Sequence, residues 1–241
     1  MIGNILNHLY NDGRVSNVEI AKMAQYAENV YFGKPCGLMD QMACAVGGFV
    51  YIDFADPKSP VIEPIPFSLS DAGFVLCILN TGGNHADLNA DYASVPAEMK
   101  AVAAKLGVTY LRETSAEALL DKLAPIRAEC GDRAVLRSIH FLQENDRVVK
   151  QVSALRAGDF DGFKKLIIES GNSSFEYLQN VYATCDIKEQ SMSLALALAQ
   201  RVLDGSGAWR VHGGGFGGTT QNFVPLDKLD AFKTLIEKVF G

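Results

Sequence analysis

The feature that most constrains how this chain folds is a run of five glycines in six residues, at positions 213–218. Segments with strand character lie on both sides of it, at 208–212 and 219–224. Glycine loses more conformational freedom on folding than any other residue, so such a run needs a structural or functional reason. One reason is a loop whose bare N–H groups surround a phosphate. The other is a tight connection between strands, and the composition of the run leaves both open.

A second stretch punctuated by glycine, at 33–48, places a carboxylate in the first turn of a short predicted helix. Gly33, Pro35 and Gly37 form a loop whose backbone a ligand could approach closely. Asp40 follows this loop as a candidate catalytic or ligand-binding group. The alternative is that Asp40 has only a structural role, because an aspartate is favoured in the first turn of a helix. Read by itself, the stretch favours that alternative.

Length and charge narrow the class of protein. The 241 residues, of which 48% are hydrophobic and 21% charged, are typical of a soluble globular protein with one large domain or two small ones. The net charge of -6 argues against a general affinity for nucleic acid or anionic membranes. Five scattered cysteines without metal-ligand spacing indicate reduced thiols in a cytoplasmic protein. No apolar run is long enough for a membrane span, and no signal-peptide pattern is present.

The order of predicted elements favours the α+β class. Ser16 with Glu19 forms a capping box that opens a helix. Thr114 with Glu117 and Asp186 with Glu189 are predicted to mark two later helix starts. Helices are predicted at 16–31, 86–106, 131–155, 159–170, 186–203 and 226–240, and strands at 49–54, 61–67, 74–80, 208–212 and 219–224. The segment at 74–80 is almost wholly apolar, so we expect it in the centre of an antiparallel sheet with helices stacked on one face.

One face of the predicted helix at 131–155 carries four polar residues, Arg137, His140, Glu144 and Arg147. They form a buried polar network, an active-site wall or a solvated stripe of salt bridges, and the pattern leaves these open. No two histidines have metal-ligand spacing, so no metal site is predicted.

Three segments, in order, resemble galactokinases of the GHMP small-molecule kinase superfamily. Cys-Gly-Leu-Met-Asp-Gln at 36–41 is similar to that family's Cys-Gly-Ile-Met-Asp-Gln segment. The segment 80–92, with His85 and Tyr92, resembles the part whose tyrosine contacts the sugar. The glycine run resembles the third GHMP motif, and the four polar residues of 131–155 match the family's Arg-x-x-His-x-x-x-Glu-x-x-Arg pattern.

The resemblance implies a sugar kinase that phosphorylates the anomeric hydroxyl of galactose or a close relative, with ATP and Mg²⁺. Asp40 would be the catalytic base, and Gly37 and Tyr92 would contact the sugar. Five glycines would support the triphosphate end of the site: Gly213, Gly214, Gly215, Gly217 and Gly218. The implied partners are the sugar and ATP, without nucleic acid or membrane.

The chain also departs from the family. It lacks the Gly-Arg-x-Glu-His-x-Asp segment that holds the sugar and the Pro-x-x-x-Gly-Leu-Ser-Ser-Ser loop that wraps ATP. We therefore expect a truncated form: 1–68 as a remnant of the GHMP N-terminal domain, and 69–241 as the C-terminal domain. Such a form is expected to be inactive alone, to lack most magnesium ligands, and to self-associate through an exposed apolar face.

The identity of the sugar is left open. Asn84 replaces an arginine of the family, and the acidic family pattern is not kept at 173–180. Two alternatives therefore accompany the galactokinase hypothesis. One is a non-catalytic regulator that senses galactose and ATP on the same fold. The other is a kinase for another sugar, such as N-acetylgalactosamine.

Overall fold

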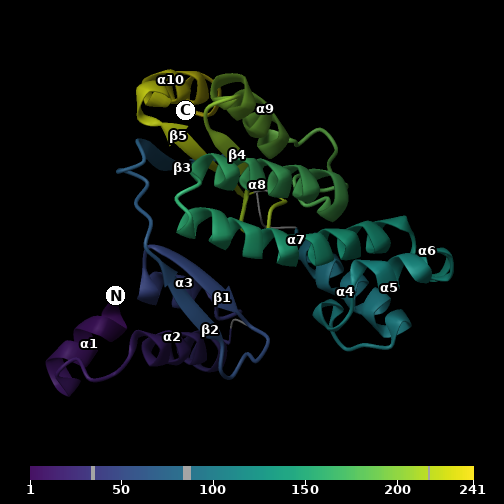
Figure 1. Cartoon of the computed structure of the whole chain (residues 1–241), viewed down its shortest axis with the longest axis horizontal. Helices are drawn as coiled ribbons and strands as arrows, with labels where there is room; N and C mark the ends of the chain where they lie inside the picture. The colour runs from purple at the N-terminus through teal and green to yellow at the C-terminus, as the bar shows by residue number, and fades with distance from the viewer. Residues whose placement is uncertain (34–35, 84–87, 217) are drawn as a thin grey trace. The chain divides into compact units, whose positions relative to one another are not determined.

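The computed structural model describes residues 1–33, 36–83, 88–216 and 218–241, which divide into two compact units, Met1–Ser68 and Leu69–Gly241. The first unit contains α1 (Ile2–Asn11), α2 (Asn17–Tyr26), α3 (Met39–Val46), β1 (Phe49–Asp53) and β2 (Val61–Ile65) (Figure 1). The second contains β3 (Phe74–Asn80), α4 (Asn89–Leu106), α5 (Ala116–Asp121), α6 (Leu123–Cys130), α7 (Asp132–Arg156), α8 (Phe160–Ser173), α9 (Ser191–Leu203), β4 (Ala208–His212), β5 (Thr219–Pro225) and α10 (Leu229–Phe240). Their identification as parts of the two GHMP domains stays a prediction.

The first unit is built on α1, α2, α3 and a β-hairpin. The predicted cap of α2 is confirmed, because the backbone N–H of Glu19 donates to Ser16 Oγ at 3.2 Å. After α2 the helix widens into a π-helical turn, Ala27–Tyr31. Met42 of α3 is completely buried, and apolar side chains of β1 and β2 pack against the same core.

The second unit has a three-stranded antiparallel sheet of order β3-β5-β4, which confirms the predicted α+β class. The prediction that the apolar strand at 74–80 lies in the centre is wrong, because β3 is at the edge of the described sheet. Successive side chains of a strand point to opposite faces. Leu79 faces the core, whereas Leu76 and Ile78 on the other face remain 43% and 48% exposed.

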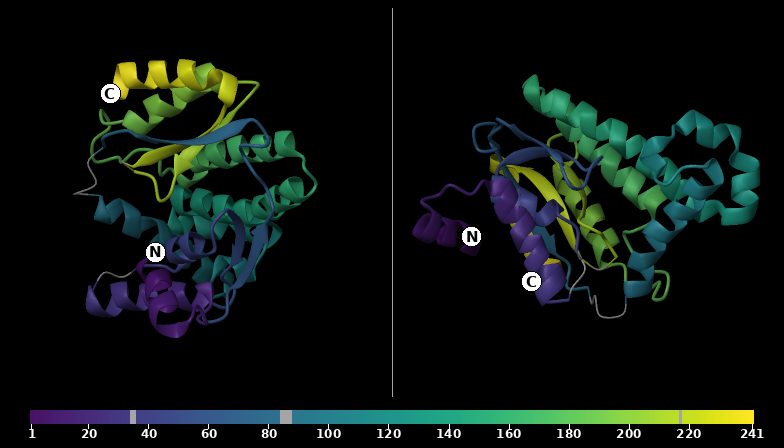
Figure 2. Two further views of the ribbon diagram at one scale, coloured as in Figure 1. Left: turned by 90° about the vertical axis from the view of Figure 1, so that its left-hand side faces the viewer. Right: turned by 90° about the horizontal axis from the view of Figure 1, so that it is seen from below.

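Helices lie on both faces of this sheet, and not on one face as expected (Figure 2). α9 and α10 pack on the face that carries Val224, where Leu203, Phe232 and Ile236 complete the core. On the opposite face, Phe163 of α8 meets the Phe223 ring edge-on at 5.6 Å. The aromatic side chains of α8 give that face of the sheet an apolar cover, which explains the difference.

A separate helical core joins α4, α5 and α6 to α7. The prediction of a long helix at 131–155 is confirmed by α7, and its apolar residues pack with Val102 and Leu119. Among the described residues, no helix combines the length and apolar character needed to cross a membrane. All five cysteines are among the described residues, and none of them forms a disulfide.

Candidate functional site

The glycine run connects β4 to β5 through backbone conformations that glycine adopts readily. Gly213 and Gly215 have positive φ angles of 66° and 84°. A Cβ on Gly215 would overlap the carbonyl oxygen of Asn180, and a Cβ on Gly214 would lie 2.8 Å from Cε1 of Tyr92. At Gly213 a Cβ would meet nothing within 4 Å. Packing therefore explains two glycines, and Gly213 faces open space.

Tyr92, in the first turn of α4, contacts this run directly. Its hydroxyl donates to the carbonyl oxygen of Gly215 at 2.7 Å. Its ring meets the Phe216 ring edge-on, with 5.2 Å between centroids. Burial raises the pKa of the Tyr92 phenol above its ordinary value, which reinforces the protonated form that donates to Gly215. The structure thus brings together the residue expected at the sugar and two glycines expected near the phosphates.

The far end of the run is fixed to the end of β3. Thr81 Oγ1 donates to the carbonyl oxygen of Gly218 at 2.9 Å, and Ser191 Oγ donates to Thr81 Oγ1 at 3.2 Å. Two sequence-predicted positions of this region, Gly217 and His85, lie outside the described residues. So does Asn84, which was noted as a departure from the family.

Asp40 and Gly37 belong to the first unit. Asp40 is exposed in the first turn of α3, and a Cβ on Gly37 would meet nothing within 4 Å. The loop before α3 is held to the preceding helix through Cys36, whose N–H donates to Asn29 Oδ1 at 2.8 Å. In addition, Gln25 Nε2 donates to the Cys36 carbonyl at 3.1 Å. These bonds fix the backbone beside Gly37 and leave its open side accessible.

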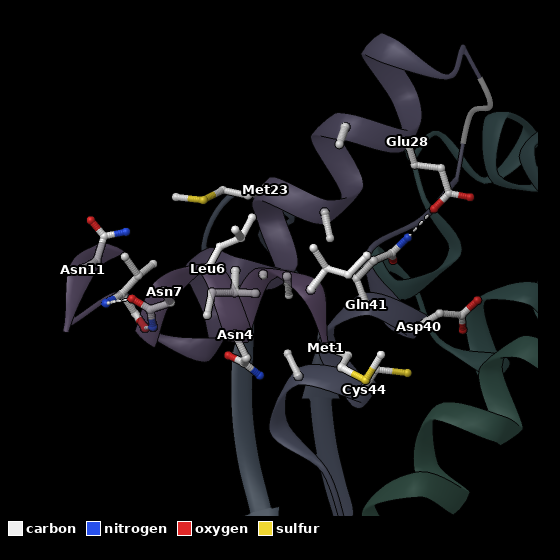
Figure 3. Close-up of a pocket in the computed structure, with 18 of the residues that line it drawn as sticks. Met1, Asn4, Leu6, Asn7, Asn11, Met23, Glu28, Asp40, Gln41 and Cys44 are labelled. Carbon is white, nitrogen blue, oxygen red and sulfur yellow. Dashed lines mark hydrogen bonds between the residues drawn. The ribbon is translucent and has the colours of Figure 1, made fainter. Parts of the chain in front are cut away.

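Asp40 also lines an open hollow of about 930 Å³ between α1, α2 and α3 (Figure 3). The hollow is mostly apolar, with contributions from Leu6 and Met23. Its polar lining residues include Asp40, Glu28 and Gln41, and Gln41 Nε2 donates to Glu28 Oε2 at 2.9 Å. Asp40 therefore lies between the apolar lining of the hollow and the hydrogen-bonded pair Glu28 and Gln41.

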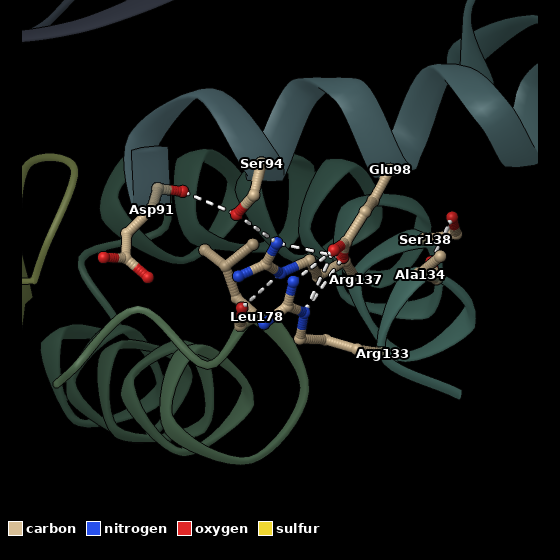
Figure 4. Close-up of polar contacts among 8 residues, drawn as sticks. All are labelled: Asp91, Ser94, Glu98, Arg133, Ala134, Arg137, Ser138 and Leu178. Atoms are coloured by element: carbon tan, nitrogen blue, oxygen red, sulfur yellow. Dashed lines mark hydrogen bonds and ion pairs between the residues drawn. The ribbon is translucent and has the colours of Figure 1, made fainter. Parts of the chain in front are cut away.

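Of the three readings of the polar face of α7, the buried network is the correct one for Arg137. Its side chain is 1% exposed. It donates to Ser94 Oγ at 2.8 Å, to Glu98 Oε2 at 2.9 Å and to the Leu178 carbonyl at 3.0 Å. Glu98 also pairs with Arg133 (Figure 4). Arg137 thus ties α4 to the chain that follows α8.

The other half of this face forms a second buried cluster. His140 Nδ1 lies 2.9 Å from Ser173 Oγ. Glu144 pairs with Arg147 and lies 3.6 Å from Nη1 of Arg210 on β4. Burial lowers the pKa of His140, and the charges of Arg210 and Arg147 act in the same direction, while Glu144 opposes them. The cluster joins α7, α8 and β4, and the reading as a solvated stripe is wrong.

The groups that the resemblance implies fit the described residues unequally. Beside Gly213 the space at the Cβ position is open, which leaves room for a ligand. Among the described residues, no group of three or more His, Cys, Asp or Glu side chains is arranged to hold a metal ion.

Two residues that hold the glycine run were missed from the sequence. Asn180 was covered only by the stretch 173–180 that departs from the family's acidic pattern, and Thr81 only by the segment 80–92 that resembles the family. Neither residue type signals a loop contact by itself. Their partners lie more than 30 positions away in sequence, so the sequence carried no local sign of the contacts.

Similarity to known kinases extends over almost the whole chain. A family model described as "GHMP kinases N terminal domain" matches residues 1–48. Galactokinase of Glaesserella parasuis serovar 5 (strain SH0165) is 32% identical over 222 residues, which are 92% of this chain and 55% of that protein. The chain thus spans about half the length of the curated relatives it matches.

Solved structures share the fold. Lactococcus lactis galactokinase, crystallised with galactose, matches with a TM-score of 0.73 at 23% identity, covering 99% of this chain and 59% of that one. The L. major mevalonate kinase in complex with R-mevalonate matches with a TM-score of 0.59 at 16% identity, covering 98% of this chain and 58% of that one.

Proposed function

We propose that this chain, which is homologous to galactokinases and has the fold of GHMP kinases, carries part of the active site of a sugar kinase. The reaction is transfer of the γ-phosphoryl group of ATP to the anomeric hydroxyl of galactose or a close relative. We expect ATP to be accompanied by Mg²⁺ and the protein to act in the cytoplasm.

The observation that carries the proposal is the bond from Tyr92 to Gly215. The resemblance assigns Tyr92 to the sugar and the glycine run to the phosphates. A sugar kinase must hold these two substrates next to each other, and Tyr92 lies against the backbone of the run. The contact between two segments that are 123 positions apart supports a shared site.

In this proposal Asp40 takes or orients the proton of the anomeric hydroxyl. Phosphoryl transfer has a loose transition state, so positioning and charge neutralisation account for most of the catalysis. An exposed carboxylate in a first helical turn is accessible to the sugar hydroxyl and suits such a role. The open space at the Cβ position of Gly37 leaves room for the sugar, which we expect to contact the backbone of this residue.

The test joins this chain to the part of the Glaesserella parasuis galactokinase that it does not match, and measures galactose-dependent ADP formation. We expect turnover, and we expect Asp40→Asn to lower kcat by about 100-fold or more while galactose affinity changes little. Asp56→Asn, in the exposed turn between β1 and β2, is the matched control. Unchanged turnover in Asp40→Asn contradicts the role of Asp40. A chimera that binds galactose and ATP without turnover contradicts the kinase in favour of a sensor.

The chain by itself is expected to be inactive. It spans only 55% of the relative that it matches at 32% identity, so a complete site is not expected within it. ADP formation by purified residues 1–241 that depends on galactose and disappears in Asp40→Asn would contradict this expectation.

A further inference from the structure

We infer that Asn180 is a positioning residue that sets the conformation of the glycine run. It lies after α8 and the π-helical turn Ser174–Leu178, and it is 2% exposed. The inference rests on the proposed function in one respect, because the run matters for catalysis only if it supports the phosphates.

Asn180 holds the run through both its backbone and its side chain. Its carbonyl oxygen accepts from the N–H of Phe216 at 2.5 Å. Its side-chain Nδ2 donates to the carbonyl oxygen of Gly214 at 3.2 Å. Tyr92 donates to the carbonyl oxygen of Gly215. Three consecutive residues of the run are therefore fixed by two side chains and one backbone bond.

The backbone of the run is one that would not persist without such support. Phe216 has a φ of 61°, in the left-handed region that a bulky side chain rarely adopts. Such a residue is retained when its surroundings over-determine its conformation. The bond to Asn180, the edge-on Tyr92 ring and burial of Phe216 with Leu88 and Ala183 provide that constraint.

The position of Asn180 is itself fixed by the residues that precede it in the chain. The preceding residue, Gln179, is also left-handed, with a φ of 56°, which turns the chain out of the π-helical turn. Arg137 donates to the carbonyl of Leu178, two residues before Asn180. The same guanidinium donates to Ser94 and Glu98 on α4, the helix that carries Tyr92. Arg137 thus links the two segments that hold the run, which gives the buried cluster of Figure 4 a role.

The consequence is a loop that is arranged before any ligand binds. A preorganised loop loses less entropy on binding than a mobile one, and its dipoles need no reorganisation. The side-chain donor of Asn180, rather than its size, is the property that the position requires. Asp is almost the same size but places an acceptor against the Gly214 carbonyl.

The experiment measures hydrogen–deuterium exchange in the peptide that covers 212–219 of the full chain, without ligand. Loss of one hydrogen bond of about 1 kcal/mol predicts exchange about five-fold faster in Asn180→Ala. Asn180→Asp is expected to exceed that increase at neutral pH, and the excess should shrink when acid protonates the new carboxyl. Tyr92→Phe, which keeps the ring, is expected to show an increase similar to Asn180→Ala. Asn172→Ala, exposed on α8, is the matched control.

The outcomes separate the inference from the proposed function. Exchange in Asn180→Ala and Asn180→Asp equal to that of the unmodified chain overturns the inference. An effect of Asn180→Ala without the excess in Asn180→Asp also overturns it, because packing alone would then suffice. If the variants behave as expected but inorganic triphosphate does not slow exchange of the same peptide in the unmodified chain, the phosphate role of the run fails and the role of Asn180 stands. Should Asn180→Ala fail to fold, Asn180→Asp, which keeps the size of the side chain, provides the readout, and exchange equal to that of the unmodified chain overturns the inference.

Discussion

At the residue scale, the glycines at 213–215 occupy positions with different surroundings. Gly215 combines a positive φ with a Cβ direction blocked by Asn180, whereas Gly213 has a positive φ and open space. The packing around Gly215 supports the tight connection, whereas the phosphate loop stays a prediction that the open space beside Gly213 leaves room for. This difference can be measured.

We expect Gly215→Ala to lower the free energy of unfolding by about 3 kcal/mol, because the new Cβ overlaps backbone that cannot move without breaking the bond to Phe216. Gly213→Ala is the matched control, and its cost should be about 1 kcal/mol, from the left-handed backbone alone. Urea unfolding of the second unit, followed by the fluorescence of Trp209, compares them. Equal costs would contradict the contrast between the two positions.

A second prediction concerns His140. Because its pKa in the folded chain is lower than the ordinary 6.5, the unfolded chain binds more protons as pH falls below that value. The contribution of neutral His140 to the free energy of unfolding is therefore fully present above about pH 6.5. It is lost as pH falls toward the lowered pKa, by at most about 1.4 kcal/mol per pH unit. Desolvation is the main cause, and Glu144, Arg147 and Arg210 are the charged groups around the ring.

The measurement is the free energy of unfolding at pH 5.0 to 7.5 for the unmodified chain and His140→Gln, a window about the ordinary histidine pKa. The pH dependence should be shallower in His140→Gln. His8→Gln, on an exposed position of α1, should keep the original slope. Identical slopes in all three proteins would show that His140 does not contribute.

At the element scale, the connection between α4 and α7 depends on Glu98. Removing its charge in Glu98→Gln leaves the buried guanidinium of Arg137 without its ionic partner, with an expected loss of about 3 kcal/mol in the free energy of unfolding. The matched control is Glu129→Gln, whose pair with Lys105 is exposed and should contribute nothing measurable. Thermal unfolding monitored by circular dichroism compares the two. A loss in Glu129→Gln equal to that in Glu98→Gln would contradict the importance of burial.

The starts of helices show which parts of the fold could be predicted from sequence. Ser16 caps α2 as expected, because its hydroxyl bonds the N–H three residues later. The predicted start at Thr114 is wrong by one residue, since Ser115 is the cap that accepts from Ala118. The predicted start at Asp186 is also wrong: its carboxylate accepts from the N–H of Lys188, which closes a turn, and α9 begins later at Ser191.

The candidate site was predictable only where a segment is contiguous. The stretch around Asp40 and the glycine run could each be recognised from adjacent residues. The bonds of Tyr92, Asn180 and Thr81 to that run depend on how distant elements pack, and the sequence gives no local periodicity for such contacts. For the same reason the polar face of α7 could not be divided into two buried clusters in advance.

At the scale of the whole molecule, the first unit leaves much of its apolar surface uncovered. Ile2, Ile5, Leu6 and Leu9 recur at helical spacing on α1 and are between 47% and 71% exposed. Together with the hollow beside them, they form what we call the α1 apolar face. Large exposed apolar patches mark interaction sites or sites of association.

We therefore expect purified residues 1–241 to self-associate through the α1 apolar face. Burial of a Leu or Ile side chain contributes about 1.5–3 kcal/mol, so placing two charges there should favour the monomer strongly. Sedimentation velocity should show dimers or larger species that shift to monomer in the double variant Ile5→Glu, Leu9→Glu. Leu120→Glu, an equally exposed apolar position on α5 in the other unit, is the matched control and should leave the distribution unchanged. A monomer at all concentrations, with no binding of an apolar dye, would show that this face is not an association surface. Dissociation by Leu120→Glu but not by the double variant would place the association on the second unit.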